Sequence, residues 1–263
     1  MSGTTEREWE FARLESDGHR ADVVVTRPEK RNAMNEGVLR DLTAAVEAAA
    51  DLEGTRAIVM LGDGPVFSAG MDLEMMRDRS TEGASRGLFP ELLSAIEDAS
   101  VPTVAAAKRA APAGAFELTL PFDFRVLGSE ARYGVIEVKL GTFPHGGATQ
   151  RLPRLVGLSK AKELVLTGEF IDPEEALACG LVHDVVPDER VDARAREFAD
   201  DLCTNAPLGM TRAKRALDAA FETSLEEGLE LERELAAEID DSHDYREGFD
   251  ARLEGREPEF EGR

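Results

Sequence analysis

Two glutamates in the central part of the chain lie among apolar residues, where carboxylates are uncommon. Glu117 lies in PAGAFELTL, shortly after a glycine, and Glu137 lies in YGVIEVKLG between Ile136 and Val138. A carboxylate among apolar side chains must be paired, be exposed by local geometry, or stay partly protonated. The two groups are twenty positions apart and each lies beside a glycine-rich turn. This arrangement predicts a pair that performs acid and base catalysis.

Two glycine turns that lead into short helical patterns could present backbone N–H groups to an anion. One is FSAGMDL, in which Gly70 precedes Met71, and the other is PAGAFEL, in which Gly114 precedes the helix of Glu117. The first N–H groups of a helix have no intrahelical acceptor, so they can bind an oxyanion. Facing one another, the turns would supply two donors to one oxygen, as an enolate or tetrahedral oxyanion requires. Each turn alone is also compatible with an ordinary strand-to-helix connection.

Other kinds of chemistry leave no motif in this sequence. There is no G-x-S-x-G elbow, P-loop, HExxH or helix-opening G-x-G-x-x-G. The four histidines are scattered, and of these only His145, in FPHGGATQ, is close to Glu137 along the chain. Cys179 and Cys203 form no CxxC pattern. Their isolation disfavours a structural zinc site and a disulfide framework, and it fits a reducing cytoplasm.

The charge balance is strongly acidic. The 263 residues include 53 acidic and 31 basic side chains, for a formal net charge of −22. This sign argues against binding to nucleic acid. Salt screens such self-repulsion, so we expect a halophilic protein that works at high salt concentration. No apolar run approaches the ~18 residues of a membrane span, and the first residues show no signal-peptide pattern, so we expect a cytoplasmic protein without membrane contact.

Strand-like and helical patterns alternate along the first 187 residues, and only helical patterns follow. This order predicts an α/β fold with a core over 1–187 and a helical region over 188–263. Such a chain is long enough for one large core. The predicted strands cover 8–14, 19–27, 55–64, 103–107, 122–128 and 181–187, and the main predicted helices cover 36–52, 87–99, 146–168 and 172–180.

Five separated motifs resemble the enoyl-CoA hydratase/isomerase (crotonase) superfamily. In chain order they are RPEKRNAMN, FSAGMDL, PAGAFEL, YGVIEVKLGTFPHGGATQRLPRLVG and LTGEFIDPEEALACGLVHDVVP. The resemblance covers nearly the whole chain, and LGTFPHGGATQRL is its most specific part. It implies a crotonase-like spiral of ββα units with two sheets and a C-terminal helical oligomerisation region. It also implies a homotrimer or homohexamer.

The resemblance assigns roles to individual positions. It implies an oxyanion hole made by the backbone N–H groups of Met71 and Gly114, with Glu117 and Glu137 as the catalytic pair. CoA would lie against the segment that follows the second strand, and Arg256 is a further candidate for a CoA phosphate. The residues assigned to CoA binding are Arg27, Lys30, Arg31, Ala33, Ala69 and Asp72.

The reaction implied by the resemblance is the addition of water to a trans-2-enoyl-CoA, which gives a 3-hydroxyacyl-CoA. It needs no metal and no redox cofactor, because CoA is part of the acyl-CoA thioester substrate. Two alternatives stay open: a double-bond isomerase, which could use Glu137 alone, and a non-catalytic binding protein on the same scaffold. The sequence leaves open the acyl chain length and the pathway, whether fatty-acid, amino-acid or aromatic degradation.

Several positions depart from the family pattern. The usual three glycines are Ala113-Gly114-Ala115, Ile136 replaces the proline before Glu137, and Pro121 interrupts the helix after Glu117. Lys108-Arg109 replaces an Asn-Gly pair, and it would either attract anionic CoA or be a simple exposed pair. The departures keep the donor glycine and both carboxylates but predict an altered turn.

Overall fold

The strands form one large sheet and one small sheet. The computed structural model describes residues 6–77 and 85–263. The small sheet pairs β6 (Ala110–Pro112) with β8 (Arg132–Gly134) in parallel. The large sheet begins with antiparallel pairs and continues in parallel from β3 onward. In spatial order its strands are β1 (Glu6–Glu8), β2 (Ala12–Asp17), β3 (Arg20–Val25), β4 (Ala57–Gly62), β5 (Thr103–Ala107), β7 (Phe124–Gly128) and β9 (Asp184–Val186). This mixed architecture confirms the predicted α/β fold.

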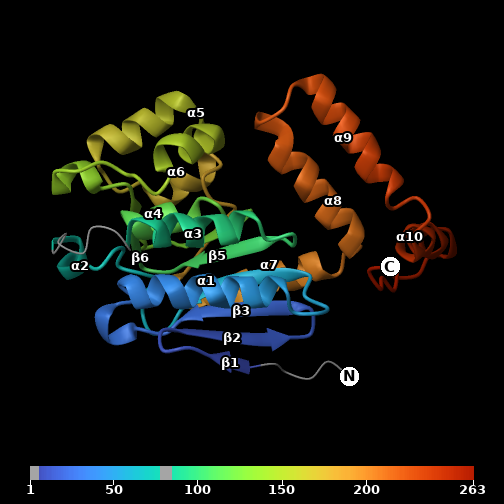
Figure 1. Cartoon of the computed structure of the whole chain (residues 1–263), viewed down its shortest axis with the longest axis horizontal. Helices are drawn as coiled ribbons and strands as arrows, with labels where there is room; N and C mark the ends of the chain where they lie inside the picture. The colour runs from blue at the N-terminus through green and yellow to red at the C-terminus, as the bar shows by residue number, and fades with distance from the viewer. Residues whose placement is uncertain (1–5, 78–84) are drawn as a thin grey trace.

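Both faces of the large sheet are covered, which explains why its central strands are continuous apolar runs. All residues of β3 and β4 are buried. Successive side chains point to opposite faces. Val23 and Met60 therefore join the core beneath α1 (Glu36–Ala50) and α3 (Ser85–Glu97), while Val24 and Val59 pack with α7 (Val191–Cys203). Figure 1 shows α1 and α3 on one face and α7 on the other.

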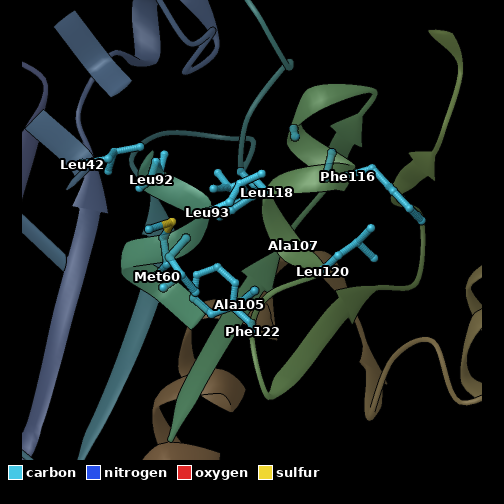
Figure 2. Close-up of a cluster of buried hydrophobic side chains, with 14 of the residues drawn as sticks. Leu42, Met60, Leu92, Leu93, Ala105, Ala107, Phe116, Leu118, Leu120 and Phe122 are labelled. Carbon is cyan, nitrogen blue, oxygen red and sulfur yellow. The ribbon is translucent and has the colours of Figure 1, made fainter. Parts of the chain in front are cut away.

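The helix that carries Glu117 is anchored in the larger of the two cores. This helix, α4 (Gly114–Thr119), is buried at every position and ends two residues before Pro121. In Figure 2, Leu118 of α4 points toward Leu92 and Leu93 of α3, above Met60 and Ala105 of the sheet. The buried contacts hold the backbone of α4 against rigid elements. A polar side chain on this helix is therefore placed with little freedom.

Two predicted elements are interrupted. The predicted strand over 8–14 is divided between the end of β1 and the start of β2, because the Trp9 N–H donates to the Ala12 carbonyl (2.8 Å) and closes a turn between them. The predicted helix over 146–168 corresponds to α5 (Ala148–Thr167), in which Gly157 leaves helical geometry at φ 78° and ψ 157°. The shorter elements between these parts are η1 (Pro28–Lys30), α2 (Leu73–Arg77), η3 (Glu137–Leu140) and α6 (Pro173–Ala178).

Helices alone follow β9 within the described part of the chain, as predicted. After α7, the helices α8 (Pro207–Asp218) and α9 (Leu225–Ala237) pack against each other to one side of the sheet (Figure 1). Several apolar side chains of this region are more than half exposed, namely Leu217 of α8, Phe221 of η5 (Ala219–Phe221) and Leu225 of α9, as are Phe249 and Leu253 of α10 (His243–Glu254). No helix within residues 6–77 and 85–263 is both long and apolar enough to cross a membrane. The elements of this region are η4 (Asp188–Arg190), α8 (Pro207–Asp218), η5 (Ala219–Phe221), α9 (Leu225–Ala237) and α10 (His243–Glu254).

Candidate active site

Glu117 is buried, and one of its oxygens is held by backbone donors. The residue is 3% exposed. Its Oε1 accepts hydrogen bonds from the N–H groups of Gly146 (2.9 Å) and Ala148 (3.0 Å). These groups belong to the start of α5, so the carboxylate lies at the positive end of a helix. Burial raises the pKa of Glu117, and the two N–H groups oppose that rise. Oε2 accepts no hydrogen bond from a described residue and can face a reactant.

Glu137 has a different environment, although its side chain is also buried. It opens η3 and is 6% exposed. Neither of its side-chain oxygens has a hydrogen-bond partner among the described residues. Burial raises the pKa of Glu137 to about 7, and the negative charge of Glu117 adds to this. The structure thus brings the two glutamates into one electrostatic environment, in which Glu137 is the carboxyl group that retains a proton more easily.

His145 lies close enough to influence both carboxyl groups. Its positive charge, when protonated, lowers the pKa of Glu117 and of Glu137, against the larger effect of burial. The side chain is exposed, and its Nδ1 is 3.0 Å from the carbonyl oxygen of Phe143. His145 is therefore at the rim of the site rather than between the two carboxyl groups.

The two glycine turns face one another. The Met34 N–H donates to the Gly70 carbonyl (2.8 Å), and the Asp72 N–H donates to the Met34 carbonyl (2.9 Å). This bridge leaves the N–H of Met71 unused. Gly114 is the first residue of α4, where an N–H has no intrahelical acceptor. A Cβ on Gly114 would lie 3.6 Å from the Met71 nitrogen, so both donors border one small space.

Gly70 is required by this close approach. Its φ is +91°, which a residue with a side chain rarely adopts. A Cβ at this position would lie 2.9 Å from the Pro112 carbonyl oxygen and 3.8 Å from the Gly114 nitrogen. A side chain here would separate the two turns and their donors.

Two buried polar side chains that sequence reasoning missed hold the first turn in place. Asn32 is fully buried, and its Nδ2 donates to the carbonyl groups of Asp63 (2.9 Å), Val66 (3.0 Å) and Phe67 (3.0 Å). The Ser68 hydroxyl donates to the Asn32 carbonyl (2.7 Å). Both residues lie inside motifs that were recognised, RPEKRNAMN and FSAGMDL. Ser68 lies between the apolar residues Phe67 and Ala69, which is a sign of a buried polar side chain, whereas Asn32 follows Arg31 and shows no such sign.

The residues predicted to bind CoA divide into two groups. Arg27 donates to the Asp72 carboxylate (2.9 Å) and to the Ala33 carbonyl (2.8 Å). Burial works against ionisation of Asp72, but the Arg27 hydrogen bond and two backbone N–H groups of α2 outweigh it and lower the Asp72 pKa. Arg27, Ala33 and Asp72 thus hold the segment 27–33 against the start of α2.

The second group is exposed. Lys30 and Arg31 are exposed and form no ion pair with any residue that the structure describes. Ala69 is also exposed, and its N–H donates to the Arg31 carbonyl (2.9 Å). Lys30 and Arg31 are therefore the cations of this loop that are available to an anionic ligand.

Other predicted cations are engaged elsewhere. Arg256 binds Glu247 through Nη1 (2.5 Å) and Nη2 (2.8 Å), next to α10. Lys108 forms an ion pair with Asp192 of α7. The interpretation of Lys108 as a free cation for CoA is thus wrong, because the acidic first turn of α7 already neutralises it, and Lys108 is also not part of an exposed pair.

Ala113 replaces a glycine of the family pattern, and its backbone conformation is one that favours glycine. Its φ is +51° and its ψ is −123°, a region that favours glycine. Replacing Ala113 by glycine should relieve strain of about 1–3 kcal/mol, offset by about 0.5–1 kcal/mol of glycine flexibility in the unfolded chain. We expect a higher urea midpoint with an unchanged slope. Ala115→Gly, inside α4 with ordinary geometry, should lower the midpoint; the same direction of change in both variants would contradict the assignment of strain.

A cavity of about 420 Å³ lies away from these residues, between α8, α10 and the C-terminal tail. Its walls include Leu208, Tyr245, Phe249 and Phe260. None of the candidate catalytic or CoA-binding residues borders it. In the described residues, no three His, Cys, Asp or Glu side chains are grouped so that they could hold a metal ion. The candidate site is therefore identified by its carboxyl groups and backbone donors rather than by cavity volume.

Comparisons with known proteins agree over most of the chain. The family described as Enoyl-CoA hydratase/isomerase matches residues 19–263. The 2,3-dehydroadipyl-CoA hydratase of Escherichia coli is 36% identical over 241 residues, which are 92% of this chain and 94% of that protein. An enoyl-CoA isomerase/hydratase of Mycosarcoma maydis is 33% identical and covers 92% of each chain. The solved structure of an enoyl-CoA hydratase from Bacillus anthracis superposes with a TM-score of 0.89 at 29% identity and covers 100% of both chains.

Proposed function

The chain belongs to the enoyl-CoA hydratase/isomerase family, and from this premise we propose that it adds water to a trans-2-enoyl-CoA and releases a 3-hydroxyacyl-CoA. One observation carries the proposal: a buried Glu137 without hydrogen-bond partners and a Glu117 fixed by two N–H groups share one site. A hydratase needs one carboxyl group that gives a proton and one carboxylate that takes a proton. The two environments favour this division of labour.

In the proposed mechanism, Glu117 orients a water molecule and accepts its proton while the water oxygen bonds to the β-carbon. The electron pair of the double bond moves toward the thioester carbonyl and forms an enolate. The N–H groups of Met71 and Gly114 stabilise the enolate oxygen, a contribution for which one donor is typically worth ~10²–10³ in rate. Glu137 then delivers its proton to the α-carbon, and exchange with solvent restores both carboxyl groups.

The substrate supplies the activating group, so the proposal includes no metal and no redox cofactor. CoA is part of the substrate, and we assign its phosphates to the exposed cations Lys30 and Arg31. Arg27, Ala33, Ala69 and Asp72 shape the loop that presents these cations. A cytoplasmic location fits the two free cysteines.

A panel of thioesters tests the proposed function. Trans-2-enoyl-CoA substrates from C4 to C16 should be hydrated, measured as loss of the conjugated enoyl absorbance at molar potassium chloride. The same panel at low salt tests the halophilic interpretation of the net charge of −22, because self-repulsion should then lower activity. Absence of hydration across the panel, with a folded protein at high salt, would contradict the hydratase.

The family also contains isomerases, as the name of the Mycosarcoma maydis relative indicates. An isomerase of 3-enoyl-CoA could move one proton with Glu137 alone. The presence of a second, fixed carboxylate at Glu117 favours the hydratase. Separate assays with 2-enoyl-CoA and 3-enoyl-CoA distinguish the hydratase from the isomerase. The hydratase hydrates 2-enoyl-CoA directly, whereas the isomerase converts 3-enoyl-CoA. A non-catalytic scaffold would consume neither.

We also propose a homotrimer or homohexamer built through the helical region over 188–263. The exposed apolar side chains of α8 to α10 support an interface there, since such residues are unfavourable in water. Light scattering at high salt measures the number of subunits.

The pH dependence of the reaction follows from the protonation states that it needs. Glu137 must carry a proton, and burial raises its pKa to about 7. We therefore expect kcat/KM to fall about tenfold per pH unit well above pH 7, as the proton is lost. At lower pH, kcat/KM should also fall as Glu117 becomes protonated, and its raised pKa moves that limb above the ordinary range of a carboxyl group. Rates measured from pH 5 to 9 test this; a constant kcat/KM between pH 6 and 9 would contradict the role of Glu137.

A further inference from the structure

Arg151 and Glu97 form an ion pair that contacts the loop over 146–148, whose N–H groups bind Glu117. Arg151, in the first turn of α5, donates from Nε (3.1 Å) and Nη2 (2.6 Å) to the two oxygens of Glu97, the last residue of α3. The remaining nitrogen, Nη1, donates to the Gly146 carbonyl (3.3 Å). The N–H of the same Gly146 donates to Glu117. A continuous chain of hydrogen bonds therefore runs from Glu97 through Arg151 and Gly146 to the carboxylate.

The guanidinium also covers the middle of the loop. Gly147 has φ +104°, and a Cβ there would lie 2.0 Å from Arg151 Nη1. On either side of it, the N–H groups of Gly146 and Ala148 converge on Glu117. Residues 146–148 thus form a small anion-binding turn, with Arg151 on one side and Glu117 on the other.

Arg151 also acts on Glu117 through charge. Burial raises the Glu117 pKa, and the positive charge of Arg151 is among the groups that lower it. The Glu97 carboxylate of α3 opposes part of this charge. His145 also lowers the pKa of Glu117 when it is protonated, and Glu137 interacts with Glu117 as a second carboxyl group. Because Glu97 fixes the guanidinium through two bonds, the distance of this charge from Glu117 is also fixed.

We propose that Arg151 and Glu97 form a positioning pair that fixes residues 146–148 and so holds the Glu117 carboxylate in the orientation that activates water. This inference rests on the proposed hydratase function. The pair is partly exposed, with 24% of the Arg151 side chain and 50% of the Glu97 side chain accessible. Ion pairs this exposed add little to stability. Its effect should therefore appear in turnover more than in unfolding.

The test compares substitutions on α3 and α5 in the full-length protein. Arg151→Gln should lower kcat for hydration about 10- to 100-fold, because a small displacement of a catalytic group has effects of this size, with KM nearly unchanged. The low-pH limb of the rate profile should move to higher pH, because the loss of the Arg151 charge raises the pKa of Glu117. Glu97→Gln keeps the Arg151 charge but weakens its fixation, so it should lower kcat without moving that limb to higher pH. Arg151→Lys keeps the positive charge, so the low-pH limb should lie at the same pH as in wild type. Lysine cannot reproduce the two hydrogen bonds to Glu97, so kcat should stay below the wild-type value.

Arg154→Gln is the matched control. Arg154 lies on the same helix, is exposed, and within the described residues donates only to the Gln150 carbonyl (2.8 Å). Its substitution removes the same charge and should leave kcat and the pH profile as in wild type. If Arg151→Gln, Arg151→Lys and Glu97→Gln all behave like this control, Arg151 and Glu97 form only a surface ion pair and the inference is wrong.

A second measurement separates this inference from the proposed function. Carbon-13 NMR of labelled glutamate carboxyl groups, with Glu117→Gln used for assignment, follows the titration of Glu117 without any substrate. The Glu117 pKa should be higher in Arg151→Gln than in wild type and unchanged in Arg154→Gln. An unchanged titration in Arg151→Gln would overturn the inference. A wild-type protein that hydrates no thioester would overturn the proposed function while leaving this titration as the test of the pair.

Discussion

Replacing Glu137 by glutamine should lower kcat for hydration by about 10²- to 10⁴-fold, the usual contribution of a positioned proton donor. Glutamine has nearly the same shape, but its amide cannot release a proton to the α-carbon. Glu137 contacts no polar partner within the described residues, so the substitution breaks no hydrogen bond of the folded chain. We expect KM to stay nearly constant and kcat and kcat/KM to fall together, the pattern of an interaction made only in the transition state.

The control for this variant is Glu130→Gln. The Glu130 side chain is exposed, and the substitution makes the same change from a carboxyl group to an amide away from the candidate active site. Turnover should stay at the wild-type level, whereas Glu137→Gln should also lose the decline of rate above pH 7. Near-wild-type turnover of Glu137→Gln on any enoyl-CoA would remove Glu137 from the mechanism. Equal losses in both variants would point to a general effect of charge.

The order of strands and helices could be predicted from the sequence because each depends on local patterns. Asn35 caps α1 through the N–H of Val38, and the apolar stripe of this helix is buried, as its spacing predicts. The predicted helix over 146–168 failed to show the break at Gly157, because a single glycine is also tolerated within helices. Local patterns therefore determine which elements exist better than where they bend.

The environment of the glutamates could be predicted only in part. Apolar neighbours in sequence left open whether the two carboxylates were exposed, paired or partly protonated, and the structure shows that both are buried. The donors to Glu117, however, come from Gly146 and Ala148, which are 29 and 31 residues later in the chain. No pattern around Glu117 encodes this contact. The difference between the two carboxyl groups, one bonded and one without partners, is thus a property of the tertiary structure.

The sequence also could not predict which basic residues are free to bind CoA. Lys108 and Arg256 were candidates for CoA because they are cations, yet each binds a carboxylate of this chain. In a chain with 53 acidic residues, a cation often pairs with a carboxylate of the same chain, as Lys108 and Arg256 do. A positive residue is therefore a weak indication of an anion site here. Lys30 and Arg31 are stronger candidates because both are exposed next to the first turn.

Replacing Glu117 by glutamine is the second change for which we expect a large effect. The amide oxygen can still accept from the N–H groups of Gly146 and Ala148, so the loop should keep its position. The base that takes the proton of water is lost, and hydration should slow by about 10²- to 10⁴-fold. Isomerisation of a 3-enoyl-CoA, if the protein performs it, needs only Glu137 and should persist. Hydration and isomerisation assays on one protein sample therefore separate the roles of the two carboxyl groups.

The stability of Glu117→Gln provides an independent measure of the same assignment. Burial raises the pKa of Glu117, which means that the folded protein holds its ionised form at a cost. A neutral amide avoids that cost, so the variant should unfold at an equal or higher urea concentration than wild type at neutral pH. A loss of hydration together with a gain in stability is typical of a residue kept for function. If Glu117→Gln instead hydrates 2-enoyl-CoA at the wild-type rate, the water-activating base lies elsewhere; if it unfolds more easily, Glu117 has mainly a structural role.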